Sequence, residues 1–203
     1  MPDLRRGSLI WLWLSVAVIA LDQVTKWIAV DALQLYQQVP IIDGLFSFTL
    51  AYNTGAAFSF LADASGWQRW LFAGIAVVVS VVLCVWLARL DRARKMEAIA
   101  LALILGGALG NLYDRVVHGK VTDFILVHWQ QSWFFPAFNI ADSAITVGAV
   151  LLLLGGLSMG MSPLSAVAVD IAGRHMSGTS TGLLDAHGYA YAGAQALIFA
   201  AVL

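Results

Sequence analysis

The chain has 203 residues and a formal net charge of -1; 61% of its residues are hydrophobic and only 11% are charged. Soluble domains carry about 25% charged residues, so this composition is typical of a protein that crosses a membrane several times. The lack of net positive charge argues against nucleic acid as a partner. The single cysteine, Cys84, excludes a disulfide within the chain.

Four hydrophobic segments approach the length of about 20 residues that a helix needs to cross a bilayer. We expect transmembrane helices at residues 9–30, 70–90, 98–112 and 140–159. The first resembles a signal peptide in its basic start, but it shows no small-residue cleavage site, so we interpret it as a retained anchor. The predicted fold class is an all-α polytopic membrane protein with four transmembrane helices.

Basic residues predict the orientation, because cytoplasmic loops of membrane proteins are enriched in lysine and arginine. Arg5 and Arg6 precede the first span, and four more basic residues follow the second. These are Arg89, Arg92, Arg94 and Lys95. Residues 31–68 contain neither lysine nor arginine, which predicts that this segment is external. Arg115 and Lys120, after the third span, are a weak signal against this orientation.

The segment 31–68 is too long for a simple connection between spans. Residues 44–50 alternate apolar and polar side chains over part of their length, which predicts a short strand or hairpin. Asn53, Thr54 and Gly55 follow with the chemistry of a turn. We expect a small external β-cradle against which an extended peptide could lie. An interfacial loop without a site is the alternative.

Two groups of polar residues interrupt the spans. Asp22 and Lys26 lie four residues apart on one helix face and predict either a self-neutralising ion pair or a brace for a site. Asn111 and Arg115 share a face of the third span. Their structural interpretations are an interhelical hydrogen bond for Asn111 and, for Arg115, an interface anchor or a partner for Asp114.

Small residues gather on the third span beside these polar groups. Gly106 and Gly110 are four residues apart, a spacing that lets a second helix approach closely. Gly107 lies one turn before Asn111, on the face that Asn111 shares with Arg115. We therefore expect a tight helix–helix contact beside the polar residues.

Asp123 and Asp142 stand at the ends of two hydrophobic spans, with residues 124–141 between them as a short aromatic loop. A charged group near the bilayer core costs about 2.5–3.5 kcal/mol, so an acid kept there usually has a function. Asn139 is expected to cap the fourth helix, with Asp142 reaching back as in a capping box. This structural role is the alternative to a chemical one.

Two acids that converge from neighbouring spans predict a dyad that shares one proton. The helix N-terminus favours the anionic form of Asp142, which leaves the proton to Asp123 as a hypothesis. The ionised acid would activate water, while the protonated acid would polarise a scissile carbonyl and later protonate the leaving amine. No cofactor or metal is required, and His118 and His128 lack the spacing of a helical zinc pair.

Five motifs carry a resemblance to a known family. In chain order they are DQVTK at 22–26, NTGAAF at 53–58, GNLYDR at 110–115, VTDF at 121–124 and FNIADS at 138–143. Over residues 9–154 the chain resembles lipoprotein signal peptidase, also called signal peptidase II. The resemblance implies an aspartic endopeptidase that removes the signal peptide from diacylglyceryl-modified prolipoproteins by cutting before the lipidated cysteine.

The resemblance also assigns roles to single residues. Asp123 and Asp142 match the catalytic pair. Polar positions around the substrate are matched by Asn53, Asn111, Arg115 and Asn139. Positions of structural support are matched by Asp22, Lys26, Gly55, Gly107 and Asp114. The implied setting is the bacterial inner membrane, with a cytoplasmic N-terminus, a periplasmic active site, membrane lipid around the chain and a monomeric state.

The resemblance ends after the fourth span. We therefore divide the chain into a membrane domain, residues 1–160, and a C-terminal extension of unassigned role, residues 161–203. Within the extension, residues 170–182 faintly resemble part of a major facilitator transporter, as a gene fusion or frame junction would produce. An extra C-terminal helix or a loosely packed appendage is the alternative.

A membrane transporter or proton-relay protein is the alternative function, because intramembrane acids also relay protons. Such a protein is expected to place its acids near the middle of the membrane and to contain repeated halves. We find no internal repeat in the sequence, which favours the peptidase.

Overall fold

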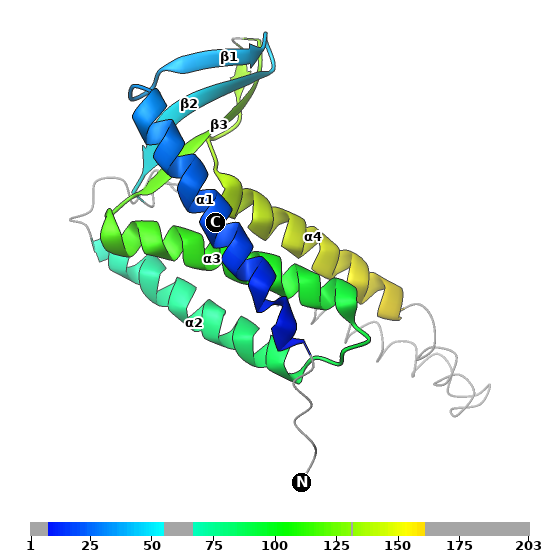
Figure 1. Cartoon of the computed structure of the whole chain (residues 1–203). Coiled ribbons are helices and arrows are strands. Elements are labelled where there is room, and N and C mark those ends of the chain that lie inside the picture. The colour runs from blue at the N-terminus through cyan, green and yellow to red at the C-terminus, as the bar shows by residue number, and fades with distance from the viewer. Residues whose placement is uncertain (1–7, 55–66, 131, 161–203) are drawn as a thin grey trace, which may run out of the picture.

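The computed structural model describes residues 8–54, 67–130 and 132–160. Four helices form a bundle, and a small antiparallel sheet lies at one end of it (Figure 1). The prediction of a helical membrane fold with a small sheet is confirmed. Arg5, Arg6, Gly55 and residues 161–203, with the extra helix predicted there, lie outside the described residues.

The helices coincide with the hydrophobic segments. They are α1 (Leu12–Ala32), preceded by the 3-10 helix η1 (Leu9–Trp11), α2 (Trp67–Arg89), α3 (Lys95–Val117) and α4 (Ile140–Gly160). Within the described residues, the stretches ending at Ala32, Arg89 and Val117 are long and apolar enough to span a membrane. The apolar part of α4, Ile140–Gly155, is shorter.

The third helix extends beyond the predicted residues 98–112 at both ends. Its C-terminal turns contain Asn111, Asp114 and Arg115, which are all buried. These polar groups find partners inside the protein, so they do not end the helix as exposed polar residues would.

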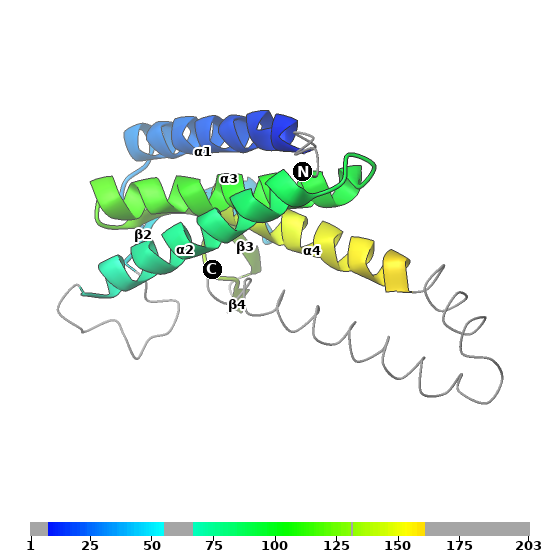
Figure 2. The same cartoon turned by 90° about the horizontal axis from the view of Figure 1, so that it is seen from below.

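α3 lies at the centre of the bundle and contacts α1, α2 and α4. Figure 2 shows α1 on one side of α3 and the other two helices on the opposite side. The main buried core joins α2, α3 and α4, and it consists of Leu83, Leu87, Leu90, Ala98, Ala100, Leu101, Ile104, Leu105 and Leu152. The outward face of α2 is apolar too, as lipid contact requires, with Val78 63% exposed.

Glycines of α3 allow the close approach of α1. A Cβ atom on Gly106 would lie 2.8 Å from the Cβ of Val18. A Cβ atom on Gly110 would lie 2.9 Å from Oδ2 of Asp22. The expected tight contact at these glycines is confirmed, and it brings the polar face of α1 against α3.

Replacing Gly107 with alanine is expected to destabilise the bundle. The added Cβ would lie 2.3 Å from the carbonyl oxygen of Ala141 and 2.7 Å from Cγ1 of Ile145, so α3 and α4 would have to separate. Overpacking of this kind costs about 1–3 kcal/mol. Gly74→Ala on α2 is the matched control, since nothing lies within 4 Å of its Cβ position. Thermal unfolding in detergent should show a lower midpoint for the Gly107 variant alone; equal midpoints would contradict the packing.

The sheet has the order β1 (Gln38–Ile42), β2 (Phe46–Asn53), β3 (Val121–Trp129) and β4 (Trp133–Phe134), with antiparallel neighbours. β1 and β2 form a hairpin whose turn contains Gly44 at φ 74°. The predicted strand at residues 44–50 is therefore shifted. Its first residues belong to the turn, and β2 continues to Asn53.

The expectation that residues 124–141 form only a loop is wrong. β3 pairs with β2, so Asp123 lies on a strand rather than at the end of a helical span. Side chains on both faces of β3 are buried along most of its length. The strand therefore lacks the alternation of polar and apolar residues that marks a half-exposed strand. The remaining signal is its content of β-branched and aromatic residues.

Candidate active site

Four polar residues meet where α3, β3 and the start of α4 come together. Asp123 lies on β3 opposite Ala51 of β2, next to a shift in the register between the two strands. Asn111 belongs to α3, Asn139 directly precedes α4, and Asp142 lies in the first turn of α4. Asp123 is only 3% exposed, whereas Asp142 is half-buried, so the site opens on the side of Asp142.

Asn139 and Asp142 form the N-terminal cap of α4. The main-chain N–H of Asp142 donates to Oδ1 of Asn139 at 2.9 Å, and the N–H of Asn139 donates to Oδ2 of Asp142 at 3.2 Å. This reciprocal pair confirms the predicted capping box. It leaves Oδ1 of Asp142 for another partner, so the capping role does not exclude a chemical one.

Asn139 connects the two acids. Its Nδ2 donates to Oδ1 of Asp123 at 2.7 Å, while its main-chain N–H holds Asp142. The same Nδ2 lies 3.3 Å from Oδ1 of Asn111 and 3.3 Å from the carbonyl oxygen of Thr122. Because Asn139 is fully buried, one fixed residue sets the relative position of both carboxyl groups, through its side chain for Asp123 and its main chain for Asp142.

Asn111 orients Asp142 from the other side. Its Nδ2 donates to Oδ1 of Asp142 at 2.7 Å, and its Oδ1 accepts from Nζ of Lys26 at 3.0 Å. An ammonium group can only donate, so Lys26 fixes the amide with its oxygen towards the lysine and its nitrogen towards Asp142. Lys26, together with the longer contact from Nδ2 of Asn139, thus fixes the orientation of a side chain that holds an acid.

Lys26 belongs to a buried ion cluster rather than to a single pair. Its Nζ lies 2.8 Å from Oδ2 of Asp22 and 2.9 Å from Oδ2 of Asp114, and none of the three side chains is more than 4% exposed. The interpretation as a self-neutralising Asp22–Lys26 pair is therefore incomplete, because the lysine also joins α1 to α3. Oδ1 of Asp22 accepts from the N–H of Ala141 at 2.9 Å, which joins α1 to α4.

Arg115 lies inside the protein, so the interpretation as an interface anchor is wrong. It is 8% exposed, and its guanidinium lies 5.6 Å from the ring centroid of Phe72 on α2. Asp114 pairs with Lys26 instead of with Arg115. The positive charge of Arg115 attracts both acids of the site.

Asn53 ends β2, opposite Val121 at the start of β3. It lies two residues after Ala51, the partner of Asp123, so the end of β2 runs beside the acid on β3. The structure therefore brings Asn53 to the neighbourhood of the site on a strand, while its predicted companion Gly55 lies outside the described residues.

Two contributors to this network are absent from the predicted site. Nε2 of Gln23 donates to Oδ1 of Asp114 at 2.9 Å. The main-chain N–H of Thr122 donates to Oδ2 of the same aspartate at 3.2 Å. Gln23 lies three residues before Lys26, a helical spacing that indicates a shared face. The main-chain N–H of Thr122 could not be predicted as a donor from the sequence, because every residue except proline has such a group.

Burial of Asp123 favours its protonated form at neutral pH. Burial raises the pKa of Asp123 to about 8, and the negative charge of Asp142 adds to the rise. The hydrogen bond from Asn139 acts in the opposite direction without cancelling the effect of burial. Asp142 receives two donated hydrogen bonds and lies at a helix N-terminus, and both features support its charged form against the effect of burial. A protonated and an ionised acid side by side can activate water and polarise a carbonyl.

Comparison with known proteins agrees with this chemistry. The family described as signal peptidase (SPase) II matches residues 14–158. A lipoprotein signal peptidase of Pseudomonas syringae pv. tomato is 70% identical over 148 residues, which are 73% of this chain and 86% of the relative. Another, of Pseudomonas aeruginosa, is 68% identical over 155 residues, or 76% and 92% of the two chains.

A solved bacterial membrane enzyme has the same fold with a TM-score of 0.63 and 30% identity, over 74% of this chain and 87% of that one. A second solved bacterial membrane enzyme gives a TM-score of 0.63 at 31% identity, over 72% and 90%. The residues that the family matches, 14–158, contain the whole network of buried acids and amides around α3, β3 and α4. With a family match over most of its length and such identities, the chain belongs to the signal peptidase II family of aspartic peptidases.

Proposed function

We propose that this aspartic endopeptidase removes the signal peptide from diacylglyceryl-modified prolipoproteins with Asp123 and Asp142 as its catalytic pair. Family membership favours the peptidase over a transporter or proton relay. The main support for this pair is that Asn139 hydrogen-bonds both carboxyl groups. Two acids held by the side-chain and main-chain N–H groups of the same residue can act together on one scissile bond.

In the proposed reaction, Asp142 takes a proton from a water molecule while the water oxygen attacks the scissile carbonyl carbon. Asp123 donates its proton towards the carbonyl oxygen, which gains negative charge as the tetrahedral intermediate forms. When the carbon–nitrogen bond breaks, the pair returns one proton to the leaving amine of the lipidated cysteine. The signal peptide leaves with a new carboxyl group, and no covalent intermediate forms.

Neighbouring polar residues hold the acids and the substrate in this scheme. Asn111 and Asn139 keep the carboxyl groups in place, and Arg115 and Asn53 contact the peptide beside them. Structural support comes from Asp22, Lys26, Gly55, Gly107 and Asp114. For Lys26 the support is specific, because its contact with Asn111 sets the donor that faces Asp142.

The proposed setting is the bacterial inner membrane, with four spans, a monomeric chain and a cytoplasmic N-terminus. The sheet and the start of α4, which carry the acids, lie at one end of the bundle, and the basic connection between α2 and α3 lies at the other (Figure 1). This separation supports an active site at the periplasmic face. Residues 1–160 would form the membrane domain, and residues 161–203 an extension without an assigned role.

A direct test uses the purified chain in lipid vesicles with a diacylglyceryl-modified prolipoprotein. We expect two products, the free signal peptide and a protein that begins with the lipidated cysteine, identified by mass spectrometry. The same precursor without its lipid serves as the control and should be cut much more slowly. Failure of the folded protein to cut the modified precursor would refute the proposed function.

Activity should fall as the pH rises through about 8, because Asp123 then loses the proton that polarises the carbonyl. The kcat, measured on both sides of this pH with saturating substrate, checks the expectation. The stability of the fold should also decrease as the pH rises. The unfolded chain releases this proton near 3.8, so the free energy of unfolding decreases as the pH rises between 3.8 and about 8. A kcat that stays level well above the pKa of Asp123 would contradict the protonated role.

A further inference from the structure

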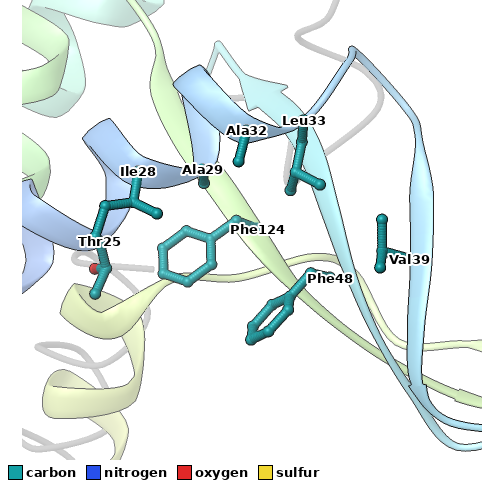
Figure 3. Close-up of a pocket in the computed structure, with 8 residues that line it drawn as sticks. All are labelled: Thr25, Ile28, Ala29, Ala32, Leu33, Val39, Phe48 and Phe124. Atoms are coloured by element: carbon teal, nitrogen blue, oxygen red, sulfur yellow. The ribbon is translucent and has the colours of Figure 1, made fainter.

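An apolar cavity of about 220 Å³ lies between the end of α1 and the sheet (Figure 3). It is lined by the last turns of one helix and by three strands, through Ile28, Ala29, Ala32, Val39, Phe48 and Phe124 among others. The proposed reaction uses none of these side chains. Figure 3 shows the two phenylalanine rings between the helix and the strands.

The chemistry of the lining selects a hydrocarbon ligand. No charged residue is found among the described residues that line the cavity. Thr25 contributes a hydroxyl, but its Oγ1 already lies 2.8 Å and 2.9 Å from the carbonyl oxygens of Leu21 and Asp22. A polar head group placed here would lose its hydrogen bonds to water without replacement, which excludes it energetically.

The cavity lies next to one of the two acids along β3. Phe124 follows Asp123 directly on β3, and the two side chains point to opposite faces of the strand. A ligand held by Phe124 therefore lies across one strand from the acid.

The helix that lines the cavity is also joined to the start of α4. Thr25 lies three residues after Asp22, whose carboxylate binds the N–H of Ala141 at 2.9 Å. The next residue along the chain is Asp142. The cavity thus borders the strand that carries Asp123, and its helix is tied to the helix that carries Asp142.

The cavity is also accessible from the lipid-facing side of the bundle. Ile28 is 51% exposed and Phe48 is 37% exposed, although both are apolar. Ile28 lies on α1, one of the helices that are long and apolar enough to span a membrane. A hydrocarbon chain could enter from the bilayer without crossing water.

We propose that this cavity binds one acyl chain of the diacylglyceryl group on the substrate. The proposal rests on the proposed function, since that group is attached to the cysteine beside the scissile bond. A chain held against Phe124 fixes the cysteine relative to Asp123 and so converts lipid binding into orientation of the peptide. A bilayer phospholipid offers the same hydrocarbon, but only the substrate gains catalytically from a site next to the acids.

The test compares two lipopeptide substrates, one with long acyl chains and one with acetyl groups in their place. Ala32→Phe fills the cavity with a ring. Ala20→Phe is the matched control, because Ala20 is also an exposed alanine of α1 but does not line the cavity. We expect Ala32→Phe to lower kcat/KM for the long-chain substrate about 10-fold and to leave the acetyl substrate unchanged. Ala20→Phe should change neither value.

The outcomes separate the two proposals. If the parent protein cuts neither substrate, the proposed function itself fails. If the parent cuts both and Ala32→Phe slows both equally, the acyl site is wrong while the function stands.

A crosslinking experiment on the unmutated protein tests the occupant without any risk to folding. A photoreactive group at the end of the substrate acyl chain should label peptides that contain Phe48 or Phe124. Labelling of these peptides by a phospholipid with the same group, and not by the substrate, would overturn the assignment.

Discussion

Replacing either Asp123 or Asp142 with asparagine is expected to lower kcat by at least about 10³-fold. Asparagine has nearly the shape of aspartate, but its amide cannot accept a proton from water in the place of Asp142. Nor can it supply an acidic proton to the carbonyl oxygen in the place of Asp123. Because the two acids have different tasks, neither variant is expected to be rescued by the remaining acid. Initial rates with saturating diacylglyceryl-modified substrate give the comparison.

Stability measurements distinguish this loss from unfolding. Asp123 is 3% exposed and its pKa is raised by burial, so asparagine removes the cost of ionising a buried acid. The thermal midpoint of Asp123→Asn should therefore equal or exceed that of the parent. Asp43→Asn in the exposed β1–β2 turn is the matched control and should keep full activity. Normal turnover by a folded Asp123 or Asp142 variant would remove the proposed pair.

Interactions between residues close in sequence could be predicted without a structure. Asp22 and Lys26 form the expected pair because four residues make one helical turn. Asn139 and Asp142 form the expected capping box because the spacing of three residues fixes their geometry. The helices themselves follow from hydrophobic length, since a segment in lipid must satisfy its own backbone hydrogen bonds.

Interactions between residues that are far apart in the sequence could not be predicted from residue spacing. Asn139 donates directly to Asp123, which lies on β3. Because the sequence predicts a loop after Asp123, the spacing of the two residues does not predict this hydrogen bond. The contact of Lys26 with Asp114 depends on the close approach of α1 and α3 at small residues. The sequence indicated that a tight contact exists on α3, but not which helix or which side chains it joins.

The resemblance to a family indicates that Asp123 and Asp142 act as a pair, but it does not show which side chains hold them in place. Lys26 shows the difference. Its motif position indicated only support, whereas its three contacts reach two carboxylates and the amide that faces Asp142. A residue on the first helix therefore influences an acid on the fourth.

Replacing Lys26 with methionine is expected to destabilise the fold by about 3–5 kcal/mol, the usual cost of leaving buried charges without a partner. Asp22 and Asp114 would then face each other inside the protein without the cation that now separates them. Lys95→Met at the start of α3 is the matched control, because Lys95 is exposed and its loss should change stability little. Thermal unfolding in one detergent compares the two variants, and equal midpoints would show that the cluster contributes nothing.

A triple variant separates the two roles of Lys26. When Lys26→Met is combined with Asp22→Asn and Asp114→Asn, no unpaired charge stays buried, so much of the lost stability should return. The kcat should stay below that of the parent, because the amide of Asn111 keeps only its longer contact with Asn139 and lacks the ammonium that helps to turn its nitrogen towards Asp142. Stability without activity in the triple variant would make Lys26 a positioning residue for the acid pair. Recovery of both would reduce it to a structural brace, and recovery of neither would show that charge repulsion is not the cause of the instability.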